Sequence, residues 1–76
     1  MRTFVATYKI YDSNDTKFKD ILINKNIKYK FVEQDDYTIC YLTIVSSNRL
    51  QMRKYKKEGL SNLKKMGKVE LIVSVG

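Results

Sequence analysis

The chain has 76 residues, no proline, three glycines, one cysteine and no histidine, and its formal net charge is +7. This length suits one small domain, and a hydrophobic fraction of 43% is too high for a disordered chain. Without histidine there can be no Ser-His-Asp triad, no Cys-His dyad and none of the usual zinc sites. We therefore expect a single domain over residues 1–76 that has no cofactor and is not an enzyme.

The sequence predicts a cytoplasmic protein. Cys40 has no partner for an internal disulfide, which favours a reducing compartment. Residues 2–11 alternate polar and apolar side chains and so lack the apolar core of a signal peptide. No apolar run is long enough to cross a membrane. Abundant Lys, Asn, Ile and Tyr suggest an AT-rich genome, such as that of a low-GC bacterium or its phages, whose proteins would act in the host cytoplasm.

The first predicted element is a strand over residues 3–11, where β-branched and aromatic residues alternate between two faces. Turn-forming residues follow it, and Asn14 or Asp15 can cap a helix. Apolar residues at helical spacing then predict a short helix over residues 16–26. A strand through residues 21–23 is the alternative for this segment.

Two further strands are predicted over residues 27–33 and 37–45, and the short turn between them indicates a hairpin. The chain is expected to close with a strand over residues 68–75. The apolar residues expected on one face of that strand are Val69, Leu71, Val73 and Val75.

Residues 49–68, which we call the basic block, hold eight Arg or Lys residues against one acid, Glu58, so the block alone carries a charge of +7. Capping residues 46–48 precede it and predict a helix. Lys56 falls near the apolar side and would have to extend its amine past it. The apolar stripe expected on this helix is Met52, Tyr55, Gly59, Leu63 and Met66.

Two glycines bear on how this helix runs and ends. Gly59 is unfavourable inside a helix, so a break there, with Ser61 capping a second short helix, is the alternative to one continuous helix. Gly67 is placed where a left-handed residue would end the helix.

The predicted order is β-α-β-β-α-β. With right-handed crossovers this order gives an α+β, ferredoxin-like fold: a four-stranded antiparallel sheet with both helices on one face.

The basic block points to an anionic partner. A helix whose polar face is merely solvated usually mixes charge signs to form i,i+4 pairs, and this one has almost no acids. Lys and Arg on one face bind phosphates with salt-dependent, largely sequence-independent affinity. A solvated face remains the simpler interpretation. The candidate nucleic-acid-binding residues are Arg49, Arg53, Lys54, Lys57, Lys64, Lys65 and Lys68.

The sheet face away from the helices is the second candidate surface. Tyrosines among lysines can stack bases and hold phosphates. RNA-recognition domains share this fold and use aromatics on the two central strands, but the strand YTICYLTIV lacks their Gly-Phe consensus. Apolar residues on this face favour homodimerisation or docking on another protein instead. The candidate contact residues are Lys9, Tyr11, Tyr37, Ile39 and Tyr41.

Carboxylates are the remaining candidates for chemistry, and they could hold Mg²⁺ for phosphodiester cleavage. Asp12 directly follows the strand FVATYKIY, and Asp35 and Asp36 lie in the predicted hairpin turn. The position of Asp12 resembles that of the acid in Cas2-like proteins, and this resemblance implies a Mg²⁺-dependent nuclease as a further candidate function. The sequence favours these aspartates as turn formers and helix caps. Cys40 is expected to pack as a small buried residue.

Two functions follow from these patterns. The first is a small, non-catalytic protein that binds DNA or RNA phosphates through the basic second helix. The alternative is a phage or mobile-element protein that docks on an acidic surface of a host protein or defence complex and inhibits it, in an anti-CRISPR-like role.

Overall fold

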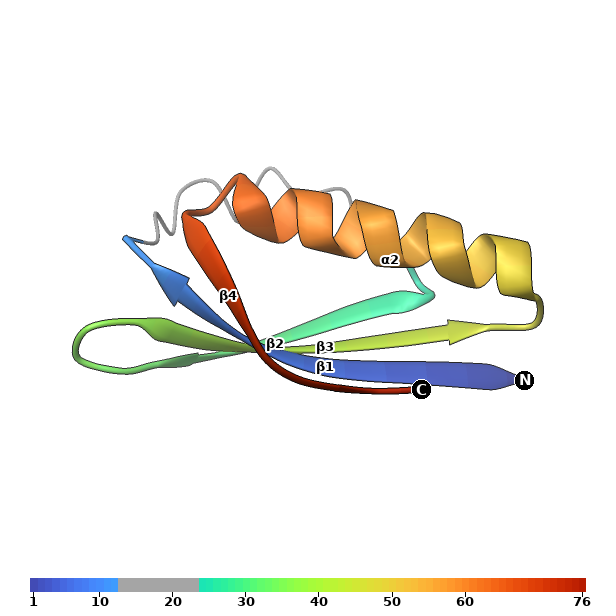
Figure 1. Ribbon diagram of the computed structural model, residues 1–76, viewed down its shortest axis with the longest axis horizontal. Helices are drawn as coiled ribbons and strands as arrows, with labels where there is room; N and C mark the ends of the chain where they lie inside the picture. The colour runs from blue at the N-terminus through green and yellow to red at the C-terminus, as the bar shows by residue number, and fades with distance from the viewer. Residues whose placement is uncertain (13–23) are drawn as a thin grey trace.

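The computed structural model describes residues 1–12 and 24–76. The strands form one antiparallel sheet in the order β2-β3-β1-β4, and α2 lies across one face of it (Figure 1). The predicted α+β class and four-stranded antiparallel sheet are therefore confirmed. The elements are β1 (Arg2–Tyr11), β2 (Ile27–Glu33), β3 (Thr38–Ser46), α2 (Arg49–Lys64) and β4 (Lys68–Val75).

Among the described residues there is one helix where the sequence predicted two. The other expected helix, over residues 16–26, falls mainly on residues 13–23 and so lies outside the described part of the chain. Its last positions form a turn into β2, in which the backbone N–H of Asn26 donates to the side chain of Asn24 at 2.9 Å. Within the described residues one helix, α2, covers the sheet face where two were expected.

Strand pairing divides the sheet into a helix side and an open side. Directly opposed residues of an antiparallel pair point to the same face. Ala6 lies opposite Leu42 and Tyr8 opposite Cys40, and all four are buried beneath α2. The alternate residues of β1, such as Lys9, therefore point to the open side, as the alternation in the sequence predicts.

The core lies between α2 and the helix side of β1, β2 and β3. Burying one large aliphatic side chain contributes about 1.5–3 kcal/mol to stability. The one amide buried in α2, Asn62, donates to the hydroxyl of Tyr29 at 3.0 Å, which satisfies the amide and ties α2 to β2. The largest fully buried side chains are Ile10, Leu42, Ile44, Leu63 and Cys40.

The helix α2 is continuous through Gly59, so the alternative of a break with Ser61 as a second cap is wrong. The reason is close packing. A Cβ at Gly59 would lie 3.2 and 3.3 Å from the two Cδ atoms of Leu42, so glycine lets the helix approach β3. The helix begins at Asn48, whose side chain accepts a hydrogen bond from the backbone N–H of Gln51 at 2.8 Å.

The prediction that Gly67 ends the helix in a left-handed conformation is also wrong. Within the described residues only Asp12 and Gly76 have positive φ angles, of 56° and 106°. Gly67 is needed for space instead, because a Cβ there would collide with the backbone carbonyl oxygen of Tyr11.

The edge strand β4 departs most from its predicted pattern. Its register against β1 shifts between Thr7 and Tyr8: Leu71 lies opposite Tyr8, whereas Val73 lies opposite Thr7. The extra residue, Ile72, is a β-bulge that reverses which side chains face the helix. The expectation that one face of β4 carries Val69, Leu71, Val73 and Val75 is therefore wrong. The first two lie on the helix side and the last two on the open side.

Candidate nucleic-acid interface

The basic side chains of α2 are exposed while its apolar stripe is not. Met52, Gly59 and Leu63 are buried against the sheet, Met66 is buried just beyond the helix, and Tyr55 is half-buried. The predicted stripe is therefore confirmed. The exposed cations predicted to bind nucleic acid are Arg49, Arg53, Lys54, Lys57 and Lys64 on α2 and Lys65 directly after it.

These charges have no acidic partners in the part of the chain that the structure describes: none of them forms an ion pair there. Glu58, the one acid of α2, lies close enough to Tyr29 on β2 to help raise the pKa of that phenol, behind the larger effect of burial. Because like charges repel, the uncompensated cations cost stability that a bound anion would restore.

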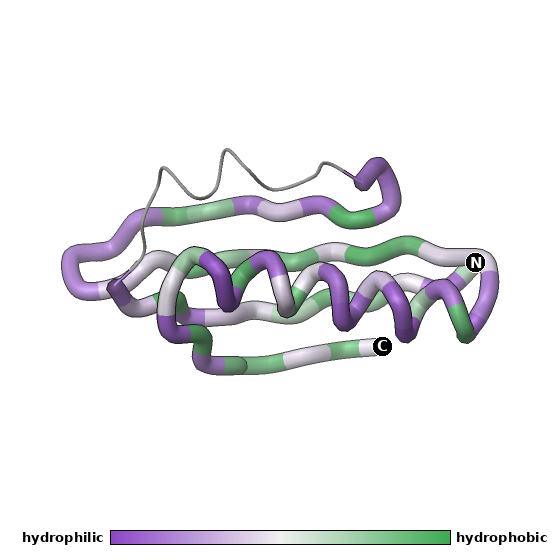
Figure 2. The backbone as a smooth tube through the Cα atoms, turned by 90° about the horizontal axis from the view of Figure 1, so that it is seen from above, coloured by the Kyte–Doolittle hydropathy of each residue, from purple (hydrophilic) through white to green (hydrophobic). Residues whose placement is uncertain are grey.

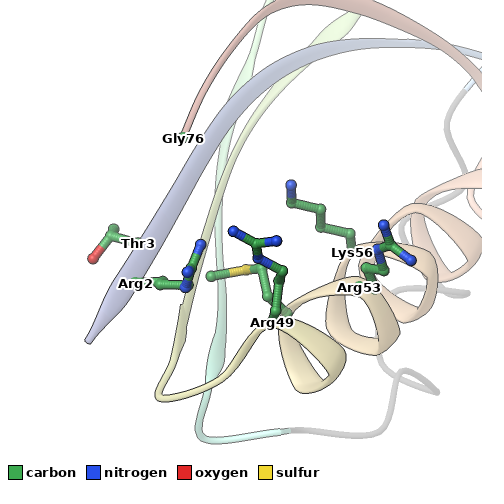
Figure 3. Close-up of a pocket in the computed structure, with 7 residues that line it drawn as sticks. Arg2, Thr3, Arg49, Arg53, Lys56 and Gly76 are labelled. Atoms are coloured by element: carbon green, nitrogen blue, oxygen red, sulfur yellow. The ribbon is translucent and has the colours of Figure 1, made fainter.

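Three of the helix cations line a pocket beside the start of β1. Arg49, Arg53 and Lys56 line an open pocket of about 470 Å³ whose opposite wall includes Arg2 of β1 (Figure 3). The buried side chain of Met52 also lines it, with Thr3 and Gly76 at the margin. The residues that line the pocket include four cationic side chains and no Asp or Glu.

Lys56 is held in this pocket by an aromatic ring. Its Nζ lies 4.4 Å from the ring centroid of Phe4, a cation–π contact. Phe4 is on the helix side of β1, two residues from Arg2, so both belong to one row of side chains. The sequence predicted an amine that extends past the apolar stripe; in the structure this amine lies over the ring of Phe4.

Lys68 does not join the cations of α2. It is the first residue of β4 and lies opposite Tyr11, which places its side chain on the open side of the sheet. There it lines a shallow pocket with Asp12, Asp36 and Glu70. Lys68 is therefore close to acids, unlike the candidates on the helix.

On the open side, three of the predicted contact residues form a cluster. The rings of Tyr11 and Tyr37 lie 6.1 Å apart at 58°, and the Nζ of Lys9 lies 4.6 Å from the ring centroid of Tyr37. The Tyr11 hydroxyl donates to a carboxylate oxygen of Glu70 at 2.9 Å, which raises the pKa of Tyr11. These groups contact one another, which leaves less ring surface for a base.

The other two predicted residues lie farther along β3. Ile39 is opposite Lys9 and is half-buried, whereas Tyr41 is 40% exposed between Thr7 of β1 and Lys30 of β2. Tyr41 is thus the candidate ring with the most open surface for stacking.

The carboxylates of the described residues do not assemble into a metal site. Asp12 ends β1 in a left-handed conformation and, with Asp35 and Asp36, lines a pocket at the hairpin turn. Yet within residues 1–12 and 24–76 no three acidic or cysteine side chains could together hold a metal ion. Cys40 is fully buried, and burial raises the pKa of its thiol to about 12, so at neutral pH it is a packing residue.

The sequence reasoning missed two cations of this pocket: Lys56, which it placed near the apolar side of the helix, and Arg2. Arg2 was missed because it is far from the other cations in the sequence. It lies 47 positions before Arg49 and outside the basic block. The alternation of side chains along β1 could have identified Arg2. Phe4 and Ala6 point to the helix side of the sheet, and the residue two positions before Phe4 on that side is Arg2.

Comparison with protein families, with characterised proteins and with solved structures found no match. Among the described residues, no helix has the length and apolar character needed to span a membrane.

Proposed function

We propose that this is a small, non-catalytic cytoplasmic protein that binds nucleic acid by contacting phosphates with the cations of α2. The single observation that carries the proposal is that these side chains are exposed and, within the described residues, unpaired by acids. The helix is about 24 Å long, from a rise of about 1.5 Å per residue, so its outer face can span several phosphates.

The strand order and the crossover from β3 through α2 to β4 also support a ferredoxin-like β-α-β-β-α-β plan for the whole chain. In that plan the basic helix covers one face of the sheet and leaves the other open. This arrangement gives the protein two surfaces for two different partners.

The test is the salt dependence of binding to duplex DNA and to single-stranded RNA, measured by fluorescence anisotropy. The logarithm of the binding constant falls linearly with the logarithm of the salt concentration. Each lost phosphate contact reduces the steepness of that fall by about 0.9 on duplex DNA and about 0.7 on single strands. Lys57→Gln/Lys64→Gln should therefore lower the duplex slope by about 2 and weaken binding.

Lys28→Gln/Lys30→Gln is the matched control, because it removes the same charge from exposed positions on β2. It should leave the slope unchanged. Equal losses in both variants would indicate diffuse attraction by net charge, and a loss in the control alone would move the interface to the open side. Absence of binding at low salt would end the proposal.

A second function, docking on a host protein, is favoured by the apolar side chains of β4. Leu71, Ile72, Val73 and Val75 are 54%, 48%, 51% and 67% exposed on an edge strand. The other edge strand, β2, carries Lys28 and Lys30 on its open side, which is how proteins usually protect an edge. An unprotected apolar edge is typical of a strand that meets a partner.

Size-exclusion chromatography with light scattering, followed by capture of partners after nuclease treatment, tests this second function. A nuclease-resistant partner that is lost in Val73→Lys supports docking. A doubled mass that the same variant abolishes would mean that the sheet pairs two copies of this chain. A monomer that captures no protein would rule docking out.

A further inference from the structure

We propose that the pocket between β1 and the first turns of α2 is a binding site for one phosphate group, and that in nucleic acid it receives a terminal phosphate. The residues that bind it are Arg2, Arg49, Arg53 and Lys56 (Figure 3). The terminal-phosphate part rests on the proposed nucleic-acid function; the binding of free phosphate does not.

The pocket differs from a solvated patch because two elements build it. Arg2 comes from the start of β1, and the other three cations come from α2 at spacings of four and three residues, which places them on one flank of the helix. Figure 3 shows the side chains of Arg2, Arg49 and Lys56 gathered around the space between the strand and the helix. One small anion can therefore meet several of them at once.

The side chains are suited to phosphate. A guanidinium group presents two parallel N–H donors that match two phosphate oxygens, and the pocket holds three guanidinium groups. Lys56 adds an ammonium group that its contact with Phe4 holds near the strand. The adjoining first turn of α2 contains no acid to repel an anion, and the N-terminal end of a helix favours negative charge.

Charge favours a terminal phosphate over one in the chain. A phosphomonoester carries about −1.5 to −2 charges at pH 7, whereas a backbone phosphodiester carries −1. Because four cationic side chains and no Asp or Glu line the pocket, the more highly charged group removes more of their mutual repulsion. A terminal phosphate can also enter an open pocket at the end of α2 without the nucleic-acid chain having to continue beyond the pocket.

The experiment is a ¹⁵N-HSQC titration with inorganic phosphate at constant ionic strength, in the full chain. We expect saturable shifts at Arg2, Met52 and Arg53. Arg2→Gln/Arg49→Gln should raise the Kd for phosphate at least tenfold. Lys28→Gln/Lys30→Gln is the matched control, since it removes the same charge from exposed positions on β2 and should leave the Kd unchanged. Circular dichroism would confirm that all variants fold.

A second arm compares oligonucleotides that have either a 5′-phosphate or a 5′-hydroxyl. We expect the phosphorylated form to bind at least fivefold more tightly, and Arg2→Gln/Arg49→Gln to abolish that preference. Non-saturable phosphate shifts, or equal losses in the two variants, would overturn the pocket. Equal binding of the two oligonucleotides would overturn the terminal-phosphate assignment.

The two proposals can fail separately. Salt-dependent oligonucleotide binding together with non-saturable phosphate shifts would refute the pocket and keep the nucleic-acid function. Saturable phosphate binding in a protein that binds no oligonucleotide would keep the pocket and refute that function.

Discussion

Gly59→Ala should destabilise the protein, although alanine is the better helix former. Alanine gains about 1 kcal/mol over glycine inside a helix. Here the new methyl would lie 3.2 and 3.3 Å from the Cδ atoms of Leu42, whose side chain is fully buried and has little room to move. Overpacking of this kind costs about 1–3 kcal/mol, so we expect a net loss of about 1 kcal/mol.

A double-mutant cycle separates these opposing effects. Leu42→Val removes both Cδ atoms and should itself cost about 1–2 kcal/mol. In that background the methyl at residue 59 has space, so Gly59→Ala should now stabilise the protein by about 1 kcal/mol. The change of sign corresponds to a coupling of about 2 kcal/mol between the two positions.

Urea denaturation followed by circular dichroism is the assay. With a slope of about 1 kcal/mol per molar urea, each expected change moves the midpoint by about 1 M. Ser61→Ala, at an exposed position of the same helix, is the matched control and should stabilise by a few tenths of a kcal/mol. If Gly59→Ala stabilised the protein equally in both backgrounds, the helix would not approach β3 as closely as described.

Three further substitutions test the stability of the fold and its dependence on pH. Asn48→Ala removes the cap on the N–H of Gln51 and should cost about 1 kcal/mol in urea denaturation. Gly67→Ala should cost more than Gly59→Ala, because its Cβ meets the backbone carbonyl of Tyr11 and not a side chain that can move; an equal or smaller loss would contradict that contact. Burial raises the pKa of Cys40 from 9.0 to about 12, so between these values the unfolded thiol ionises first and stability falls as the pH rises. The fall due to this thiol is at most about 1.4 kcal/mol per pH unit, and Cys40→Ala should show a shallower alkaline decline in urea midpoint.

The strands and the basic helix could be predicted because their signals are local. Residues 27–33 and 68–75 were bounded as the structure has them, and the buried stripe of α2 followed from side-chain spacing. The role of Gly67 could not be predicted in this way, because the atom that requires it belongs to Tyr11, far away in the sequence. The continuity of α2 through Gly59 likewise depends on where Leu42 lies in the folded protein.

The bulge in β4 was hidden for a different reason. From Leu71 to Val75 the chain is apolar at every position except Ser74. Polar and apolar residues therefore do not alternate there, and the sequence cannot show which side chains face the helix. Only the pairing of β4 with β1 shows that the side chains of β4 change faces at Ile72. The misplacement of Lys68 has a related cause. It was grouped with the helix by its charge, whereas its pairing with Tyr11 places it on the open side.

The structure also changes how the two candidate surfaces relate to each other. From sequence they were expected on opposite faces, with the cations above the sheet and the partner surface below it. Instead, the edge strand β4 runs along the margin of the molecule beside α2 (Figure 2). Its end meets the basic pocket, since Gly76 contributes to the pocket wall.

This adjacency has a consequence for binding. A protein that paired with the β4 edge would bring its neighbouring side chains beside Arg2 and Arg49, so an acidic group in that partner would occupy the place proposed for phosphate. A basic or neutral partner would leave those cations unpaired next to an interface, which is unfavourable. In such a complex charge complementarity would favour an acidic partner, and binding of that partner and of a terminal phosphate would be mutually exclusive.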